Sequence, residues 1–195
     1  MPSVLKKVHV SLAELNLWLN SKKTWLENTC WSLPDYPGIK VNIDGSWLEG
    51  QNRVGFGGVI RDSLGRWLGG FASSEIGGDP LRAELLAIKE GLSFCWNFGY
   101  KQVVCETYCI DAISAIERAI WERNLVHKHR DIINNIKDLV KKDWRVVFIG
   151  IPREINQVVY VLTSWRTRLR TQHVTWKNPP NFMFEVYEKD RCSLH

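Results

Sequence analysis

The sequence contains no uninterrupted apolar run of about 18 residues, the length that a membrane-spanning helix needs. Its first residues, MPSVLKKVHVSLAEL, lack the long apolar core and the small-residue cleavage site of a signal peptide. No low-complexity tract or internal repeat appears, and no long linker rich in Pro, Gly or Ser divides the chain. These absences predict a soluble intracellular protein, cytoplasmic or nuclear, that has no membrane partner.

Paired cysteine motifs are missing as well. The five cysteines, at positions 30, 95, 105, 109 and 192, are odd in number and form no CxxC or Cys/His zinc pattern. A disulfide framework and a structural zinc site are therefore not expected. A reducing compartment is the simpler interpretation.

What is present is an ordinary globular balance. Of the 195 residues 45% are hydrophobic and 24% charged, which suits one packed domain with terminal additions. The net charge of +5 is compatible with a polyanionic partner but does not require one, because a modest excess of Lys and Arg also serves solubility. The ten tryptophans are interpreted mainly as packing anchors, with stacking platforms for nucleic-acid bases as the alternative.

The order of apolar patterns predicts an α/β protein. We expect an N-terminal helical extension over residues 1–36, a central domain over 37–168 and a C-terminal tail over 169–195 that packs on or near this domain. In the central domain, three hairpin-linked strands precede a helix, a strand, two helices, a strand and a last helix. This order predicts a mixed five-stranded sheet flanked by helices, in which βαβ units bring strand ends to one cleft. The Trp-rich N-terminal segment is a candidate surface for a protein partner.

Five motifs in the central domain are specific when taken together. They are KVNIDGSW, GFGGVIRDSLGRWLGGF, RAELLAIKEGL, VVCETYCIDAI and IPREINQVVYVL, and the tail adds TWKNPPNFMFEVYEKD. Over the span from Ile39 to Arg166 this combination resembles the ribonuclease H-like fold family, specifically the plant reverse-transcriptase-like ribonuclease H domain proteins. The resemblance implies a ribonuclease H-like fold and a cleft where two Mg²⁺ or Mn²⁺ ions, about 3.5 to 4 Å apart, support phosphodiester hydrolysis.

The resemblance also implies four acidic ligands and a loop histidine, and this sequence keeps part of that set. Asp44, on the first strand, and Glu84, on the first helix of the domain, match two acidic positions and are the expected metal ligands and catalytic residues. The third and fourth acidic positions are Tyr108 and Tyr160, and Gly150 stands where the histidine is expected. A neutral phenol, with a reference pKa of about 10, does not replace a carboxylate as a magnesium ligand near neutral pH.

The depleted acidic set leaves more than one interpretation open. In the first, the protein keeps the fold and an RNA-binding surface, and its hydrolytic activity is lost, weak or altered. In the second, a rebuilt site still cuts, with Glu106 on the strand or Asp111 in the first turn of the next helix as a substitute acid. These two could instead be an ordinary polar-face residue and a favourable helix N-terminal charge. In a third interpretation the fold is a scaffold for protein interaction.

The partner that the resemblance implies is an RNA-containing duplex, either double-stranded RNA or an RNA–DNA hybrid. Such duplexes are gripped at the minor groove, where 2′-hydroxyls distinguish RNA from DNA. Candidate nucleic-acid-binding residues lie within the motifs or in short basic clusters, which are also common on solvated surfaces. They are Ser46, Arg82, Lys128, Arg130, Arg153 and Asn156.

Overall fold

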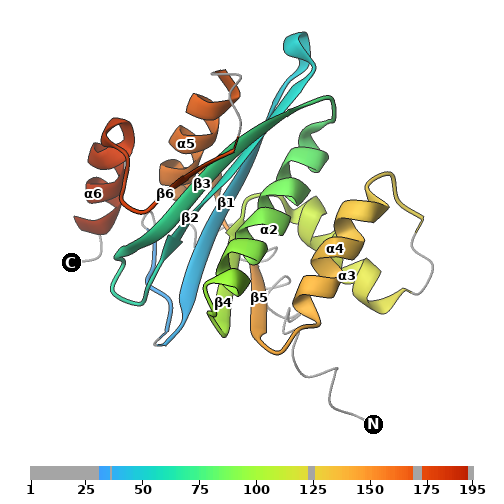
Figure 1. The fold of residues 1–195 in the computed structure, drawn as a ribbon, viewed down its shortest axis with the longest axis horizontal. Coiled ribbons are helices and arrows are strands. Elements are labelled where there is room, and N and C mark those ends of the chain that lie inside the picture. Colours follow the sequence, from blue (N-terminus) through green and yellow to red (C-terminus); the bar gives the residue numbers. More distant parts are fainter. Residues whose placement is uncertain (1–30, 36, 123–125, 169–172, 193–195) are drawn as a thin grey trace, which may run out of the picture.

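The structure is a computed structural model that describes residues 31–35, 37–122, 126–168 and 173–192. The helical extension expected over residues 1–36 falls largely outside these ranges. Within them a single mixed sheet runs through the molecule, in the order β5-β4-β1-β2-β3-β6 (Figure 1). No described helix is long and apolar enough to span a membrane.

The elements follow one another as the apolar patterns predict. The strands are β1 (Ile39–Leu48), β2 (Arg53–Arg61), β3 (Trp67–Ile76), β4 (Gln102–Thr107), β5 (Arg145–Gly150) and β6 (Val174–Trp176). The α-helices are α2 (Pro80–Asn97), α3 (Ile110–Trp121), α4 (Arg130–Val140), α5 (Gln157–Arg168) and α6 (Phe184–Cys192). Three short 3₁₀ helices are η2 (Glu49–Gln51), η3 (Arg153–Ile155) and η4 (Asn181–Met183).

The pairing of the strands is mixed. β1, β2 and β3 pair antiparallel, whereas β4 is parallel to both β1 and β5. The expected α/β fold with flanking helices is confirmed, but the expected number of five strands is wrong. β6 adds a sixth strand antiparallel to β3. Its three residues are too few to produce a recognisable alternating pattern, so the sequence gives no sign of it.

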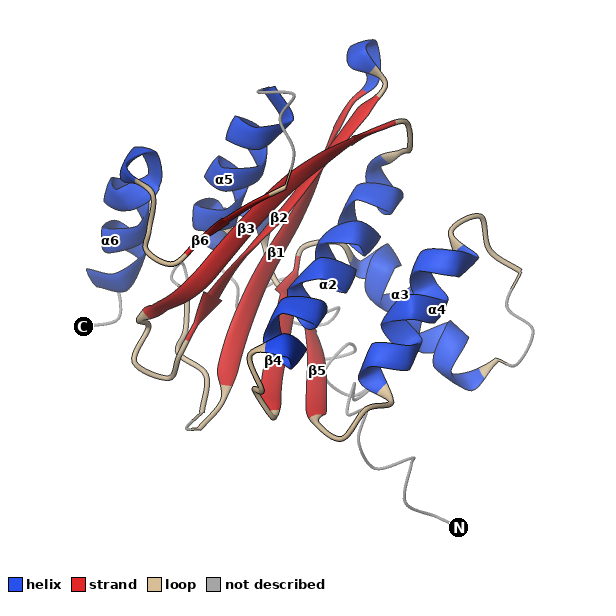
Figure 2. Cartoon of the chain, in the orientation of Figure 1, coloured by secondary structure: helices blue, strands red, loops and turns tan. Residues whose placement is uncertain are grey.

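Helices cover both faces of the sheet, which makes three layers (Figure 2). The larger core joins the sheet to α2, α3 and α4, where Val41 and Ile43 of β1 pack with Leu85 and Ile88 of α2. The smaller core joins the opposite face to α5 and α6 through residues that include Val59, Val158, Leu162 and Tyr187. β1 is therefore buried on both faces, and a polar side chain on it lies in the interior.

Two local signals set the helices that border the cleft. α2 begins at Pro80, because the Asp79 side chain accepts a hydrogen bond from the Arg82 backbone N–H at 2.8 Å and caps the helix. The last helix of the domain, α5, begins at Gln157, after the short helix η3. Arg153 consequently lies on a tight connection between β5 and α5.

A buried arginine joins the ends of the described chain to the sheet. The Arg61 guanidinium carbon lies 3.4 Å from the centre of a Trp31 ring, and the side chain is 1% exposed. Arg61 Nη1 pairs with Asp190 Oδ2 of α6 at 2.6 Å, and Nη2 donates to Asn42 Oδ1 at 2.7 Å. This network was not predicted from the sequence, because its members are far apart along the chain.

Candidate nucleic-acid cleft

The cleft is built where β1 touches the start of α2. A Cβ atom on Gly45 would lie 2.5 Å from the backbone of Ala83 and Glu84, so only glycine permits this approach. The Gly45 backbone N–H donates to Glu84 Oε1 at 2.9 Å. Asp44 precedes Gly45 on the strand, and both carboxyl residues are 1% exposed. The structure thus places the two predicted acids, Asp44 and Glu84, at one site.

Burial and mutual repulsion make these carboxyl groups hard to ionise. Burial, followed by the charge of Asp44, raises the pKa of Glu84 to about 8. Burial also raises the pKa of Asp44 to about 6, although a hydrogen bond from Thr163 and the positive charge of Arg153 act in the opposite direction. At neutral pH the pair therefore carries less than its full formal charge.

Most of the carboxylate oxygens already accept hydrogen bonds. Glu84 Oε2 accepts from Thr107 Oγ1 at 3.1 Å, and the Tyr108 hydroxyl also hydrogen bonds to the Glu84 side chain. Asp44 Oδ2 accepts from Thr163 Oγ1 of α5, whereas Asp44 Oδ1 is buried with no hydrogen-bond partner among the described residues. Neither threonine was predicted from the sequence as a site residue. Thr163 lies one helical turn beyond Tyr160, and that spacing was the available signal.

The two tyrosines at the expected acidic positions both contact one cation. Tyr108 lies between β4 and α3, and Tyr160 lies on α5. The Arg153 guanidinium carbon is 5.3 Å from the centre of the Tyr108 ring and 4.8 Å from that of Tyr160, within the range of cation–π attraction. Burial, with Glu84 next, raises the pKa of Tyr108 well above its ordinary value, so its phenol stays neutral.

The two candidate substitute acids lie in different environments. Glu106 is 3% exposed; its Oε1 pairs with Lys40 Nζ at 2.6 Å, and its Oε2 accepts from Trp31 Nε1 at 3.0 Å and Asn42 Nδ2 at 2.7 Å. Asp111 is exposed and lines a pocket of about 420 Å³ together with Glu84 and Tyr108. Asp111 therefore lies at the cleft, whereas the Glu106 carboxylate is buried and already bound to Lys40, Trp31 and Asn42.

Gly150 ends β5 opposite Thr107 of β4. A Cβ atom at position 150 would lie 2.2 Å from Ile110 Cδ1. A side chain at this position would therefore require the side chain of Ile110, the first residue of α3, to shift.

The described residues of the cleft do not fit a pair of divalent cations. Two such ions need several carboxylates to offset their repulsion, and Asp44 and Glu84 are the two acids that β1 and α2 bring together. Among these oxygens only Asp44 Oδ1 lacks a hydrogen-bond donor. Nowhere in the described ranges do three or more His, Cys, Asp or Glu side chains form a metal-binding group.

The polar candidates for nucleic-acid contact have internal roles. Asn156 is 3% exposed and donates from Nδ2 to the Ile43 carbonyl at 2.8 Å, which ties the start of α5 to β1. Ser46 is half-buried and donates to the Gly55 carbonyl at 3.4 Å across the hairpin. Of these two, Ser46 alone retains surface that a ligand can reach.

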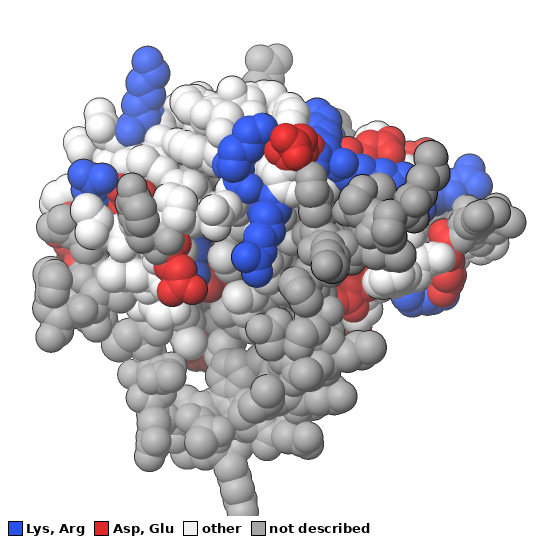
Figure 3. All heavy atoms as spheres, turned by 90° about the horizontal axis from the view of Figure 1, so that it is seen from below, with Lys and Arg blue, Asp and Glu red and all other residues white. Residues whose placement is uncertain are grey.

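The basic candidates differ in whether an acidic neighbour neutralises them. Arg82 pairs with Glu75 and Lys128 pairs with Asp79, each at 2.7 Å. On the face drawn in Figure 3, Lys and Arg side chains form separate groups with Asp and Glu among them. Two candidates, Arg130 and Arg153, are exposed and form no ion pair with any described residue.

Comparison with known proteins identifies the family. Residues 42–166 match the family described as reverse transcriptase-like. The chain is 25% identical over 160 residues to the protein named "Putative ribonuclease H protein" from Arabidopsis thaliana; the match covers 82% of this chain and 25% of that protein. The chain therefore spans about a quarter of that relative's length.

Solved structures show the same fold. The crystal structure of LC11-RNase H1 in complex with RNA/DNA hybrid superposes with a TM-score of 0.58 at 19% identity, covering 67% of this chain and 96% of that chain. The N-terminal RNase H domain of rv2228c from Mycobacterium tuberculosis gives a TM-score of 0.57 at 14% identity, covering 67% and 98%. Together with the family match, these likenesses show that the chain belongs to the reverse transcriptase-like, ribonuclease H-like family.

Proposed function

We propose that this domain binds RNA-containing duplexes, either double-stranded RNA or an RNA–DNA hybrid, and that its hydrolytic activity is lost or weak. The observation that carries the proposal is the composition of the cleft. Asp44 and Glu84 meet there, but Tyr108 and Tyr160 stand where two further acids would complete a metal centre. The family membership supports a nucleic-acid ligand, and the missing carboxylates argue against efficient metal-assisted cleavage.

The charge distribution supports binding to a polyanion. The chain carries a net charge of +5, and Arg153 lies exposed at the cleft with no acidic partner among the described residues. The fold is shared with LC11-RNase H1, a structure solved in complex with an RNA/DNA hybrid. Phosphate contacts from arginine side chains supply affinity without reading base sequence, so we expect shape-dependent rather than sequence-dependent binding.

The experiment that tests this function measures binding and cleavage separately. The purified chain is incubated with labelled double-stranded RNA, hybrid and DNA duplex in Mg²⁺, Mn²⁺ or chelator, and both retardation and product length are followed. We expect salt-dependent binding of the RNA-containing duplexes with no products above those of a protein-free control. Metal-dependent cleavage that Asp44→Asn abolishes would overturn the loss of activity, and absence of duplex binding at low salt would overturn the whole proposal.

A second candidate function, a metal-dependent endoribonuclease on the same duplexes, is favoured by two observations. Asp44 Oδ1 has no hydrogen-bond donor among the described residues, and Asp111 lines the same pocket as Glu84. A rebuilt site would use Mg²⁺ or Mn²⁺ through these acids. In that case Asp111→Asn should lower the cleavage rate. If the first proposal holds, the wild type cleaves too little for this substitution to have an effect.

A further inference from the structure

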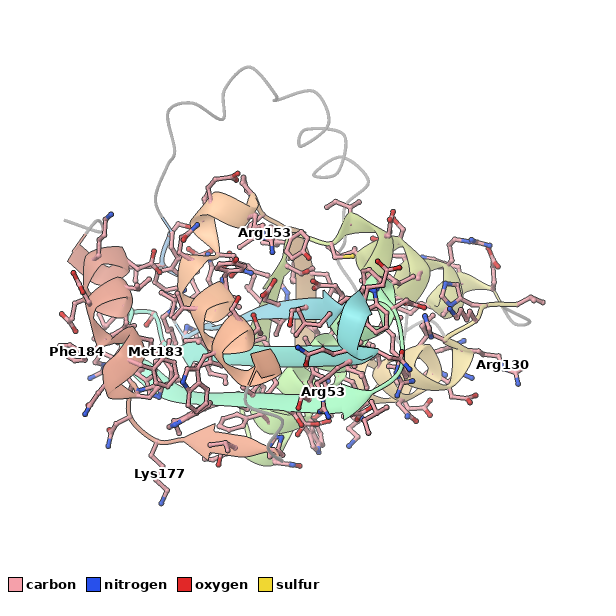
Figure 4. The ribbon with its side chains drawn as sticks, turned by 90° about the horizontal axis from the view of Figure 1, so that it is seen from above. Arg53, Arg130, Arg153, Lys177, Met183 and Phe184 are labelled. Atoms are coloured by element: carbon pink, nitrogen blue, oxygen red, sulfur yellow. The ribbon has the colours of Figure 1, made fainter. Side chains whose placement is uncertain are left out.

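The feature that carries a further inference is the arginine held between the two tyrosines. Tyr108 comes from the junction of β4 and α3, Tyr160 from α5, and Arg153 from the short helix η3 that follows β5. Two side chains from separate parts of the chain thus contact the guanidinium group of a third part. In Figure 4 Arg153 lies between the start of α5 and the α3 side of the molecule, apart from Arg130 and Lys177.

We propose that Arg153, clamped by Tyr108 and Tyr160, is a phosphate-binding cation that takes the place of divalent ions in this cleft. This inference rests on the proposed function and names the group that contacts the backbone of the duplex. It also implies that binding of the duplex is independent of Mg²⁺.

The contacts of Arg153 leave its donors available. The two rings lie 5.3 and 4.8 Å from its guanidinium carbon and fix the group through their faces, so its N–H edge is not consumed by this contact. No carboxylate in the described part of the chain lies within ion-pair distance of Arg153, although its charge acts on the buried Asp44, whereas Arg82 and Lys128 each have an acidic partner at 2.7 Å. A planar guanidinium with free donors matches two oxygens of a phosphodiester.

The neutral side chains of the two tyrosines suit a position beside a cation that has to bind an anion. A carboxylate beside Arg153 would form an ion pair and neutralise it, whereas a neutral phenol holds the cation and leaves its charge available to a ligand. The Tyr108 hydroxyl also hydrogen bonds to Glu84. Tyr160 is 40% exposed, so the clamp opens to solvent on its side. Tyr108 and Tyr160, which stand at the two expected acidic positions, therefore act together to hold Arg153.

The test compares duplex binding by variants that separate charge from geometry. Arg153→Gln removes the cation, and Arg153→Lys keeps a charge but loses the planar fork. Tyr108→Leu combined with Tyr160→Leu keeps the arginine and removes the clamp. The control is Lys177→Gln, which removes one positive charge from an exposed residue on another side of the molecule. All variants are first shown to be folded by circular dichroism.

We expect Arg153→Gln to weaken double-stranded RNA binding about ten- to a hundredfold, as for loss of a hydrogen bond to a charged group. Its salt dependence should fall by about one phosphate contact. Arg153→Lys and the double Leu variant should weaken binding about three- to tenfold, and Lys177→Gln by less than about threefold. Replacement of Mg²⁺ by chelator at constant ionic strength should leave the wild-type affinity unchanged within about twofold.

Two outcomes would overturn the clamp while leaving duplex binding intact. They are an Arg153→Gln variant no weaker than Lys177→Gln, or a wild-type affinity that requires Mg²⁺. If the wild type binds no duplex, the proposed function fails, and inorganic phosphate then tests the clamp alone. A phosphate-dependent shift of the Arg153 Nε–H resonance, assigned with Arg153→Lys, would support the anion site, and its absence would refute it. Binding of an acidic peptide in place of duplex would also refute the inference.

Discussion

Replacement of Glu106 by Gln asks whether this buried acid belongs to the fold or to the chemistry of the cleft. The carboxylate pairs with Lys40 Nζ at 2.6 Å, and both side chains are nearly inaccessible, at 6% exposed for Lys40 and 4% for Glu106. The substitution keeps the size of the side chain and its acceptor toward Trp31. It removes the negative charge and therefore leaves a buried ammonium group without its counter-charge.

The structure sets the magnitude of the expected loss. Breaking a buried ion pair by removing one partner costs about 3 to 5 kcal/mol. Lys40 Nζ keeps hydrogen bonds to the Ser32 carbonyl at 2.8 Å and to Ser32 Oγ at 3.0 Å, which favours the lower end. We therefore expect Glu106→Gln to lower the free energy of unfolding by about 3 kcal/mol. In a domain of this size that corresponds to a fall in Tm of roughly 6 to 12 °C.

Thermal and urea unfolding monitored by circular dichroism measure this loss. Two matched variants sharpen the interpretation. Asp111→Asn, at an exposed residue of the same cleft region, should change the free energy of unfolding by less than about 0.5 kcal/mol. Lys40→Met combined with Glu106→Gln removes both charges and keeps an acceptor toward Trp31 and Asn42, so this double variant should be more stable than Glu106→Gln alone. Unchanged stability of Glu106→Gln together with loss of a metal-dependent cleavage activity would refute the structural role.

Three further predictions follow from the cleft and its borders. Tyr108→Asp combined with Tyr160→Asp should produce measurable Mg²⁺-dependent cleavage of a hybrid; no gain in folded protein would show that the cleft has diverged beyond these two residues. Gly45→Ala should lower the free energy of unfolding by about 1 to 3 kcal/mol through overpacking against the backbone of Ala83 and Glu84, whereas Gly50→Ala, with open space around its added Cβ, should be neutral in the same urea titration. Burial raises the pKa of Asp79, but hydrogen bonds from basic and backbone groups outweigh it and bring the pKa down to about 2. The stability that Asp79 contributes is therefore present above about pH 4 and lost as the pH falls toward 2, and Asp79→Asn should flatten that part of a stability-versus-pH curve.

The fold could be predicted largely because its signals are local. Val41 and Ile43 alternate with polar residues on β1, and the Asp79-Pro80 pair marks the start of α2 within two residues. β6 could not be predicted, because its three residues are a strand only through their pairing with the edge of β3. Local pattern carries the order of the elements, whereas pairing at the edge of a sheet depends on the three-dimensional neighbour.

The candidate site was predictable in part. The rest depends on contacts between residues that are far apart along the sequence. Asp44 and Glu84 followed from motifs whose residues the structure brings together. The period-two rule places Glu106 on a polar face but does not say that Lys40 shares that interior position. The clamp around Arg153 was out of reach, because its two rings come from elements separated by helices and strands in sequence. Sequence patterns find which residues carry chemistry, and the fold decides which of them meet.

Arg61 sets the limits of the piece that can be handled as a unit. The span that matches the family, residues 42–166, leaves out both Trp31, which covers the guanidinium, and Asp190, which neutralises it. In a fragment trimmed to that span, Arg61 would lose both its carboxylate and its aromatic cover, so the interior around it would open to water. A stable fragment should therefore extend at least from Trp31 to Asp190, which is wider than the span that matches the sequence family.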